Sequence, residues 1–542
     1  MIVLRDKPAY SKLGTSIPWA LARSRNVDVW RRSFSSVKTA RSYDVSTHPE
    51  YPVVSRTDWM QDAIEALNSL QTPYEILEAR RKAGIRLDKN VNAQMKDCLA
   101  RIGYSQRDLD KLNIVHVAGT KGKGSTSAFV DSILSQYRKS HDQPQNIGLY
   151  TSPHLIAVRE RFRINSQPIT PAKFARYFFD VWDALESSAK GAEVPLEKPV
   201  YFRYLTLMSY HVFLSEGVNA AVYETGVGGE YDATNIVERP AVTGISTLGI
   251  DHVFTLGNTV EKIAWHKAGI FKAGTPAFSV NQVPGAMEVV KQRAAETGVK
   301  SLSIVGIDKR LRNVKIRPDA EFQKGNASLA IHLAETVLKA IDPKFDLPAD
   351  HLPKSFVDGL EQVVWRGRCE LKVEGNIRWY FDGAHTNDSI QVAAKWFGDE
   401  SSERPTHGPR ILIFNQQGEH EALQILEVLY NTIARYGAVQ FDHVIFCTNA
   451  GNNVNHTHDS TSIENLSLQK SFAEAWKKMD ESPSTTIRVL ASIEEAFEYV
   501  RGLETSSNKT RDGKNTEIHT LITGSLHLVG RALGVLEGPA AL

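Results

Sequence analysis

Short apolar runs alternate with segments of helical periodicity along the chain from about residue 57. The first clear pair is a β-branched run over 114–117, which predicts a buried strand, and a segment over 125–137 whose apolar residues recur at helical spacing. The alternation continues, with strands predicted over 147–155, 220–223 and 241–245 and helices over 171–187, 204–214 and 260–270. Strands that alternate with helices in this way predict a mainly parallel sheet in an α/β domain.

Two shorter patterns complete this half of the chain. The segment 158–164 alternates apolar and charged residues, which predicts an exposed strand or loop edge. Thr72 and Pro73 are suited to the N-cap and the first position of a helix, and they predict a charged helix that ends at Gly84.

A second α/β pattern follows a stretch rich in proline and aspartate, 342–353, which predicts an interdomain linker. Strands are predicted at 379–381, 411–414, 443–447, 487–490 and 520–523, and surface loops at about 449–465 and 505–515. We therefore expect an N-terminal domain over 55–345, a linker over 346–364 and a smaller, Rossmann-like α/β domain over 365–542.

Composition fits a globular protein and removes several classes of function. Of 542 residues, 42% are hydrophobic and 23% are charged, and the net charge of +2 gives no reason to expect nucleic acid as a partner. No apolar run is long enough to span a bilayer. Cys98, Cys369 and Cys447 are widely separated, which suits a reducing compartment and provides no disulfide or metal framework. His456 and His458 are expected to be solvated, because no cluster with matching ligand spacing accompanies them.

The N-terminal residues have a different composition. Arginine, lysine and serine are frequent up to Tyr43, where Asp6 and Asp28 are the acidic residues. This composition is typical of a mitochondrial transit peptide, and we predict such a leader over 1–45; a disordered basic tail is the alternative. We expect a mitochondrial location, in the matrix or at the inner membrane, a cytoplasmic location, or both. An internal start at Met60 is an open alternative that would omit the leader and trim the first predicted helix.

The sequence Gly-Thr-Lys-Gly-Lys-Gly-Ser over 119–125 joins the first strand to the first helix and predicts a phosphate-binding loop. Glycines let backbone N–H groups approach phosphates, a helix N-terminus favours negative charge, and Lys123 can reach the outer phosphates. Ser125 or Thr126 can offer a hydroxyl to Mg²⁺. The spacing departs from G-x-x-x-x-G-K-[ST], because Gly124 separates the lysine from the serine. A glycine turn without a ligand is the alternative, and so many glycines, lysines and hydroxyls in one short span argue against it.

Polar residues follow each of the next predicted strands, at 152–154, at Glu224 and at Asp251 and His252. Ligands bind beyond the carboxyl ends of the strands in open α/β sheets, so these residues are expected to form one site. Glu224 is a carboxylate of the kind that Mg²⁺ prefers, and His252 can be a neutral metal ligand. Solvated loop residues are the alternative for both.

Three further residues allow two interpretations each. Lys267 is either a lysine at a helix C-terminus before a glycine cap, or a partly buried lysine whose lowered pKa permits covalent modification. Arg366 and Arg368 lie near the domain junction, where a guanidinium could stabilise transferring phosphate charge or remain a surface charge. Asp-Gly-Ala-His over 382–385 ends a strand of the second domain and could reach a nucleotide across a cleft.

A collinear series of motifs runs from about residue 58 to the C-terminus. The motifs are HVAGTKGKGS at 116–125, YTSPH at 150–154, RER at 159–161, ETGVGG at 224–229, DATN at 232–235, DH at 251–252 with LG at 256–257, KAGI at 267–270, WRGR at 365–368, DGAH at 382–385 and TGSLH at 523–527. Together they resemble the folylpolyglutamate synthases, which belong to the Mur ligase superfamily. The resemblance implies a Mur-ligase-like architecture, with an N-terminal P-loop ATPase-type domain and a smaller C-terminal α/β domain.

The resemblance also implies a reaction. ATP would phosphorylate the γ-carboxylate of a folate or folylpolyglutamate, and the amine of glutamate would attack the acyl phosphate to form a γ-linked amide. The expected substrates are folate, glutamate and ATP, and we expect a monomer. Two Mg²⁺ sites are implied, and a monovalent cation is compatible with them.

Roles follow for particular residues. We expect nucleotide binding by Gly119, Thr120, Lys121, Gly122, Lys123, Gly124, Ser125, Thr126, Asn326, Arg366, Arg368 and Asp382. One Mg²⁺ would be held by Ser125 and Glu224, and a second by Ser152, Glu224 and His252. The expected catalytic residues are Lys123, Asp382, His385 and Lys267, the last aligning with a lysine that becomes carbamylated in the family. Folate and glutamate would be bound by Thr151, Ser152, Pro153, His154, Arg159, Arg161, His385, Ser525 and His527.

Two alternatives remain open at this point. A dihydrofolate synthase or a bifunctional enzyme would use nearly the same motifs, although the leader and Lys121 in the loop favour a monofunctional synthase of eukaryotic type. A P-loop protein that binds ATP without ligating anything would not need the second set of metal ligands.

Overall fold

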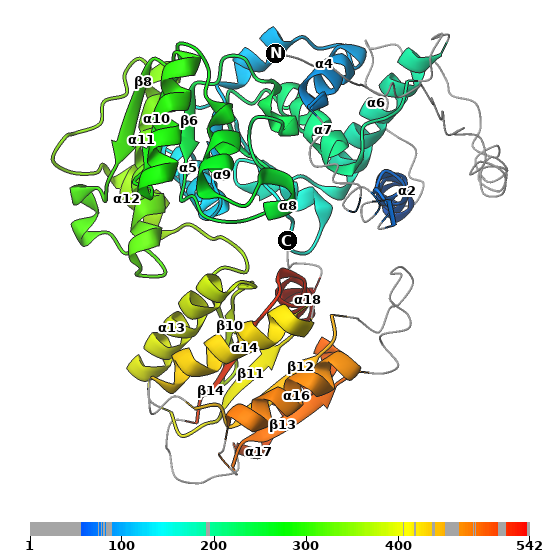
Figure 1. The fold of residues 1–542 in the computed structure, drawn as a ribbon, viewed down its shortest axis with the longest axis vertical. Coiled ribbons are helices and arrows are strands. Elements are labelled where there is room, and N and C mark those ends of the chain that lie inside the picture. Colours follow the sequence, from blue (N-terminus) through cyan, green and yellow to red (C-terminus); the bar gives the residue numbers. More distant parts are fainter. Residues whose placement is uncertain are drawn as a thin grey trace, which may run out of the picture. The chain divides into compact units, whose positions relative to one another are not determined.

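The computed structural model describes most of the chain after residue 55 (Figure 1). The described residues are 56–73, 75–76, 79, 82, 89–190, 196–404, 406–416, 419–435, 440–449, 466–480, 482, 484–507 and 516–538. All of them belong to one contact unit, Arg56–Leu542. The predicted leader, most of the predicted helix after Pro73, most of the two predicted polar loops, and His456 and His458 lie outside the described residues.

The N-terminal half forms an eight-stranded sheet in the order β4-β3-β2-β5-β1-β6-β7-β8. Its strands are β1 (Val115–Ala118), β2 (Ile147–Tyr150), β3 (Phe162–Ile164), β4 (Gln167–Pro168), β5 (Ala220–Glu224), β6 (Val242–Ile245), β7 (Pro276–Val280) and β8 (Ser301–Val305). Pairing is parallel from β2 to β8 in that order and antiparallel where β3 joins β2 and β4 joins β3. Val117 lies opposite Glu224 in the register of β1 and β5. The phosphate loop and Glu224 therefore leave the sheet at the same edge.

Helices cover both faces of this sheet, as a parallel sheet requires (Figure 1). One face packs on α5 (Lys123–Arg138), α11 (Glu321–Ile341) and α12 (Lys354–Glu361). The other packs on α2 (Arg56–Asn68), α4 (Val91–Arg101), α6 (Pro171–Ala189), α7 (Tyr201–Ser215), α9 (Val260–Lys267) and α10 (Pro284–Thr297). Short helices connect these elements: η1 (Gln106–Leu112), η2 (Val158–Arg161), η3 (Ala233–Ile236), α8 (Val253–Leu256), η4 (Ala268–Ile270) and η5 (Lys309–Asn313).

Most of the segment predicted as a linker, 346–364, is part of the N-terminal core. Helix α12 packs against α5, and Leu347, Leu352, Phe356 and Leu360 are buried in the same apolar cluster. The prolines and aspartates before α12 mark turns that lead into this helix. The connection to the second sheet is thus the shorter segment 362–369.

The C-terminal half forms a six-stranded sheet in the order β13-β12-β11-β14-β10-β9. Its strands are β9 (Glu370–Glu374), β10 (Ile377–Phe381), β11 (Arg410–Phe414), β12 (His443–Cys447), β13 (Thr486–Leu490) and β14 (Ile518–Thr523). Helices α13 (Asn387–Glu403), α14 (Glu419–Ala434) and α16 (Ser467–Met479) cover one face, and α17 (Ile493–Ser507) and α18 (Leu526–Glu537) cover the other. Only β9 pairs antiparallel among these described strands. The predicted class, two α/β domains with mainly parallel sheets, is confirmed.

One local prediction is wrong, and four strands were not predicted. The segment 158–164 is not an exposed edge, because Val158, Glu160 and Arg161 are buried in and beside η2. Its charged residues turn inward, where the Glu160 carboxylate accepts hydrogen bonds from three backbone N–H groups. The sequence pattern does not predict β4, β7, β8 or β9. Within the described residues, no helix is long and apolar enough to cross a membrane.

Candidate active site

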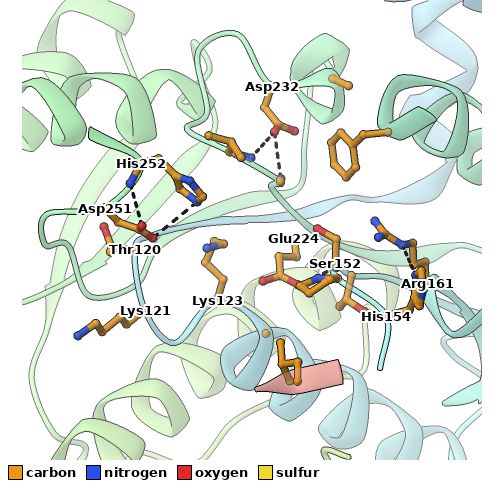
Figure 2. Close-up of a pocket in the computed structure, with 18 of the residues that line it drawn as sticks. Thr120, Lys121, Lys123, Ser152, His154, Arg161, Glu224, Asp232, Asp251 and His252 are labelled. Atoms are coloured by element: carbon orange, nitrogen blue, oxygen red, sulfur yellow. Dashed lines mark hydrogen bonds and ion pairs between the residues drawn. The ribbon is translucent and has the colours of Figure 1, made fainter. Parts of the chain in front are cut away.

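Polar residues from both halves of the chain line one cavity of ≈ 2260 Å³. The loops that follow β1, β2, β5 and β6 contribute to it, as expected at the carboxyl ends of parallel strands. The segment after β10 and the start of α13 add residues from the second sheet. Figure 2 shows the part of this cavity around the phosphate loop.

The phosphate loop packs so closely against its neighbours that it requires glycine. Gly122 has a φ of +84°, and a Cβ at this position would overlap the side chain of Asn326 in α11. Asn326 is itself buried and donates a hydrogen bond of 2.9 Å to Gln323 Oε1. Helix α5 begins at Lys123, so the N–H groups of its first turn have no helical acceptors and remain for an anion.

Two lysine side chains share one backbone oxygen beneath this loop. Lys123 Nζ donates to Gly119 O at 3.0 Å, and Lys267 Nζ donates to the same oxygen at 2.6 Å. Lys267 ends α9 and is 1% exposed. Burial, and then the charge of Lys123, lower the pKa of Lys267 to about 7. A substantial fraction of this amine is therefore neutral near pH 7, as the second interpretation of Lys267 requires.

Lys121 lies in the same loop but points away from Lys123 and Glu224 (Figure 2). Its ammonium group forms an ion pair with Asp388 in the first turn of α13. The backbone N–H groups of Thr120 and Lys121 both donate to Thr247 O, at 2.9 and 3.0 Å. These donors are thus engaged within the protein, in contrast to those of the first turn of α5.

Glu224 ends β5 and faces the loop across the cavity (Figure 2). It is 5% exposed, and its Oε2 accepts a hydrogen bond of 3.1 Å from Ser152 N. Burial raises the pKa of Glu224, although the positive charges of Lys123, Arg368 and Arg161 oppose that shift. A buried carboxylate with so few hydrogen-bond donors is suited to a cation, and the hydroxyls of Ser125 and Ser152 line the same cavity.

Asp251 and His252 follow β6 on the far side of Lys123 (Figure 2). His252 Nε2 lies 3.6 Å from Asp251 Oδ2, and the backbone N–H of His252 donates to Asp251 Oδ1 at 2.7 Å. Burial lowers the pKa of His252, which keeps its imidazole neutral and able to bind a metal. In the described part of the chain, no three His, Cys, Asp or Glu side chains gather as a metal site, so a bound Mg²⁺ would take phosphate or water oxygens as its remaining ligands.

The loop after β2 presents Thr151, Ser152, Pro153 and His154 to the cavity. Arg161 Nε donates to His154 Nδ1 at 3.1 Å. Burial and the charge of Arg161 lower the pKa of His154 to about 4, so His154 is a neutral acceptor.

Arg159, two residues earlier, differs from Arg161. It donates to Ile169 O at 3.1 Å and does not line the cavity. Of the Arg159 and Arg161 pair, Arg161 therefore lines the cavity and Arg159 does not.

Asp382 directly follows β10 and is held by Cys369 and by its own loop. Its Oδ2 accepts hydrogen bonds from Cys369 N at 2.8 Å and from Cys369 Sγ at 3.4 Å, and its Oδ1 accepts one from Ala384 N. Burial raises the pKa of Asp382, and the nearby Arg368 opposes that shift. His385, three residues on, is exposed at the cavity, and its Nδ1 lies 2.9 Å from Gly383 O.

The two arginines at the junction have different environments. Arg366 forms ion pairs of 2.9 Å with Glu370 and with Glu537. Arg368 also lines the cavity, and among the described residues its guanidinium makes no hydrogen bond or ion pair within bonding distance. Arg368 therefore has donors to offer an anionic ligand, whereas two carboxylates already neutralise Arg366.

Ser525 and His527 lie at the start of α18. Ser525 caps this helix, because its Oγ accepts from Leu528 N at 3.1 Å, and His527 is exposed. Neither lines the cavity, although Leu526 between them does.

Comparisons with known proteins agree with this geometry. A folylpolyglutamate synthase of Neurospora crassa is 58% identical over 493 residues, which cover 89% of this chain and 92% of that protein. The structure of Mycobacterium tuberculosis folylpolyglutamate synthase complexed with ADP has a TM-score of 0.65 at 21% identity, and the match covers 88% of this chain and 98% of that one. An FPGS–AMPPCP–folate complex has a TM-score of 0.59 at 22% identity, with 88% of this chain and 100% of that one covered.

This chain belongs to the folylpolyglutamate synthase family. Its fold is the two-domain, Mur-ligase-like fold of the solved family structures. No family model matches the chain.

Several residues were not predicted from the sequence although they line the cavity of this folylpolyglutamate synthase family member. Phe202, Tyr231 and Ile250 form apolar parts of the lining, and Arg163 lies beside Arg161. The aromatic residues have the spacing of core residues, so the sequence pattern could not separate them from the core. Arg163 continues the alternation of 158–164, which is a signal that could have found it.

The close fit of Gly122 gives a testable expectation for nucleotide binding. Gly122→Ala should weaken ATP binding strongly and lower the free energy of unfolding by about 1–3 kcal/mol, because its backbone conformation and the contact with Asn326 both oppose a Cβ. Gly534 in α18 is the matched control, because a Cβ there meets open space, and Gly534→Ala should leave ATP affinity unchanged. Titration with a fluorescent ATP analogue and thermal unfolding would measure both effects. Unchanged ATP affinity in Gly122→Ala would contradict the role of this loop.

Proposed function

We propose that this chain is an ADP-forming ligase that adds L-glutamate to the γ-carboxylate of tetrahydrofolate or of a folylpolyglutamate. The γ-carboxylate oxygen attacks the γ-phosphorus of ATP, ADP leaves, and an acyl phosphate forms. The amine of glutamate then attacks the acyl carbon, a proton is lost, and phosphate leaves. The observation that carries the proposal is the meeting of the phosphate loop, Glu224, Arg161 and Arg368 around one cavity in a member of this family.

The residues of this cavity suit the steps of that reaction. The first-turn N–H groups of α5 and Lys123 would hold the β- and γ-phosphates, with Asn326 beside the loop. Arg161 and Arg368 would bind carboxylates of the folate or of the incoming glutamate. His385 and Asp382 would lie beside the acyl phosphate from the second domain. Alignment and compensation of negative charge then provide most of the rate enhancement.

The donor set fits Mg²⁺. Ser125 and Glu224 would hold one ion, and Ser152, Glu224 and His252 would hold a second. Bound Mg²⁺ would neutralise phosphate charge and polarise the phosphorus towards attack. A monovalent cation is a further component of the proposal.

Lys267 is proposed to act after carbamylation. Its neutral amine would add to CO₂, forming an N–C bond and releasing a proton, and the buried side chain would become an anion next to the loop. The low exposure and lowered pKa of Lys267 support this step.

Lys267→Met should therefore lose turnover by about 10²-fold or more while remaining folded. Lys272 is the matched control, because it is also a lysine of lowered pKa, about 8 through burial, but its Nζ donates to Asn235 O and it does not line the cavity. Lys272→Met should retain most turnover. Carbon-13 NMR with labelled bicarbonate should show a carbamate signal in the wild type and in Lys272→Met but not in Lys267→Met. Near-normal turnover of Lys267→Met would refute the role.

The decisive assay for the whole proposal is ATP-dependent incorporation of labelled L-glutamate. We expect incorporation with tetrahydrofolate as the acceptor. Incorporation with dihydropteroate alone would favour a dihydrofolate synthase, and no incorporation with either acceptor would refute the ligase proposal.

Location and assembly are further proposals. The basic, acid-poor composition of 1–45 supports a mitochondrial leader, in addition to or instead of a cytoplasmic form. A fusion of residues 1–45 to a fluorescent reporter should enter mitochondria, and a cytosolic fusion would refute the leader. We propose a monomer, which sedimentation of the purified chain would test.

A further inference from the structure

The segment 362–369, which connects the two sheets, places an aromatic side chain against the phosphate loop. Trp365 lines the large cavity and is partly buried against the apolar cluster of the N-terminal half. A Cβ built on Gly124 would lie 3.1 Å from Trp365 Cζ2 and 3.4 Å from its Cε2 and Nε1. Gly124 is the second residue of α5 and the residue that departs from the common phosphate-loop spacing. The space beside this extra glycine is thus filled by the indole ring.

Helix α12 holds the connecting segment against α5 as far as Trp365. Gly359 in α12 lies so close to α5 that a Cβ there would be 2.6 Å from Ile133 Cα. Val363 packs against the same apolar cluster as Trp365. Because interiors are close-packed, the position of the indole ring follows from the contact of these two helices, and the ring limits where the first turn of α5 can lie.

The residue after Trp365 is bound to the C-terminal half. Arg366 forms ion pairs of 2.9 Å with Glu370 in β9 and with Glu537 at the end of α18. The turn that follows also binds the backbone of Trp365, whose carbonyl oxygen accepts a hydrogen bond of 3.3 Å from Arg368 N. Trp365 therefore contacts both halves of the chain, because its ring packs on the N-terminal half and its carbonyl is held by a turn of the C-terminal half.

We propose that Trp365 is a positioning residue for ATP binding. Its ring holds the first turn of α5 in the conformation that presents N–H groups to the phosphates, and its carbonyl makes that conformation depend on the position of the C-terminal half. This role rests on the proposed function, in which the phosphate loop binds ATP. A displacement of 1 Å in groups that align a substrate can cost about 10²-fold in rate, so a small movement of this ring has a large effect.

The first test is the ATP affinity of the full chain, measured by titration with a fluorescent ATP analogue. Trp365→Leu should weaken binding about tenfold or more, and Trp365→Phe, which keeps a ring, should recover part of that loss. Val364→Ala is the matched control and should leave the affinity unchanged, because Val364 is the neighbouring residue but is 68% exposed and does not line the large cavity. Wild-type affinity in Trp365→Leu would overturn the proposal.

Gly124→Ala tests the same contact from the side of the loop. With Trp365 in place, the new methyl group meets the indole ring, and ATP affinity should fall about tenfold. In the Trp365→Leu background the methyl group has room, so adding Gly124→Ala should cost less than about threefold. Equal losses in both backgrounds would show that the methyl group meets the nucleotide itself, and they would overturn the role of Trp365.

Glu537→Gln tests the link to the C-terminal half, because it weakens the hold on Arg366 and Glu537 does not line the large cavity. We expect about threefold weaker ATP binding when Trp365 is present and no further loss in the Trp365→Leu background. No loss with Trp365 present, or an equal loss in both backgrounds, would overturn the link.

Thermal unfolding of each variant separates loss of binding from loss of folding, and Trp365→Phe replaces Trp365→Leu in both comparisons if Trp365→Leu does not fold. Because the readout is ATP affinity, a chain that shows these effects but incorporates no glutamate would refute the proposed function and leave the role of Trp365 standing.

Discussion

Glu224→Gln is expected to abolish most glutamate incorporation, with a loss of turnover of about 10²–10³-fold or more. Glu224 is the residue proposed for both Mg²⁺ sites, and it is buried beside the phosphate loop with one backbone donor, Ser152 N. Glutamine has nearly the same shape but no charge, so it cannot offset the charge of the metal ions in a buried site. Steady-state assays over a range of Mg²⁺ concentrations would measure the loss. Glu224→Asp keeps the charge on a shorter side chain and should recover part of the turnover.

Glu224→Gln lowers turnover but is expected to leave the stability of the metal-free protein unchanged or to raise it. This contrast separates a chemical role of Glu224 from a structural one. Burial raises the pKa of Glu224, so the folded chain holds this proton more tightly than the unfolded chain. The stability of the metal-free protein therefore falls as pH rises through that raised pKa, and Glu224→Gln removes this fall. At mildly alkaline pH without Mg²⁺ and ATP, Glu224→Gln should have a Tm equal to or above that of the wild type. A clearly lower Tm would indicate that Glu224 supports the fold, and a wild-type turnover would refute its role with the metal.

The fold could be predicted where burial on both faces produces uninterrupted apolar runs. β1, β5, β11 and β12 are such strands, and their predicted positions agree with the structure to within two residues. β9 escapes prediction because Glu370, Lys372 and Glu374 interrupt its apolar residues, as is typical of an antiparallel edge strand. The linker prediction fails for a related reason, because local proline and aspartate content does not reveal that α12 packs on α5.

The candidate site shows a different limit of sequence reasoning. Residues that follow strands, such as Ser152, Glu224 and His252, meet around one cavity because the parallel topology brings the strand ends together. Roles that depend on partners distant in the sequence could not be foreseen. Arg366 pairs with Glu537, a residue far along the chain, and Lys121 pairs with Asp388 in the second domain. No spacing rule relates such pairs, so only three-dimensional packing distinguishes Arg366 from Arg368.

The difference between the two lysines of the phosphate loop gives the second large expected effect. Lys123→Ala should weaken ATP binding and reduce turnover by about 10²–10³-fold, because no other ammonium group of the loop faces Glu224 (Figure 2). Lys123 Nζ donates to Gly119 O. A phosphate oxygen can take the place of Gly119 O as the acceptor for Lys123, because Gly119 O still accepts a hydrogen bond of 2.6 Å from Lys267 Nζ. Removing Lys123 also removes one of the influences that lower the pKa of Lys267, so the amine of Lys267 should be more fully protonated in the variant and less able to take up CO₂.

Lys121→Ala is the matched control, because it removes a lysine two residues away. Its ammonium is exposed and paired with Asp388, and exposed ion pairs contribute only about 0–1 kcal/mol. We expect a change in kcat/KM for ATP of less than about tenfold for Lys121→Ala and a similar small change for Asp388→Asn. Initial rates at varied ATP for the three variants would separate the roles. Equal losses in Lys121→Ala and Lys123→Ala would mean that Lys121 leaves Asp388 and binds the nucleotide when the enzyme is loaded, since a surface ion pair alone cannot account for a loss of that size.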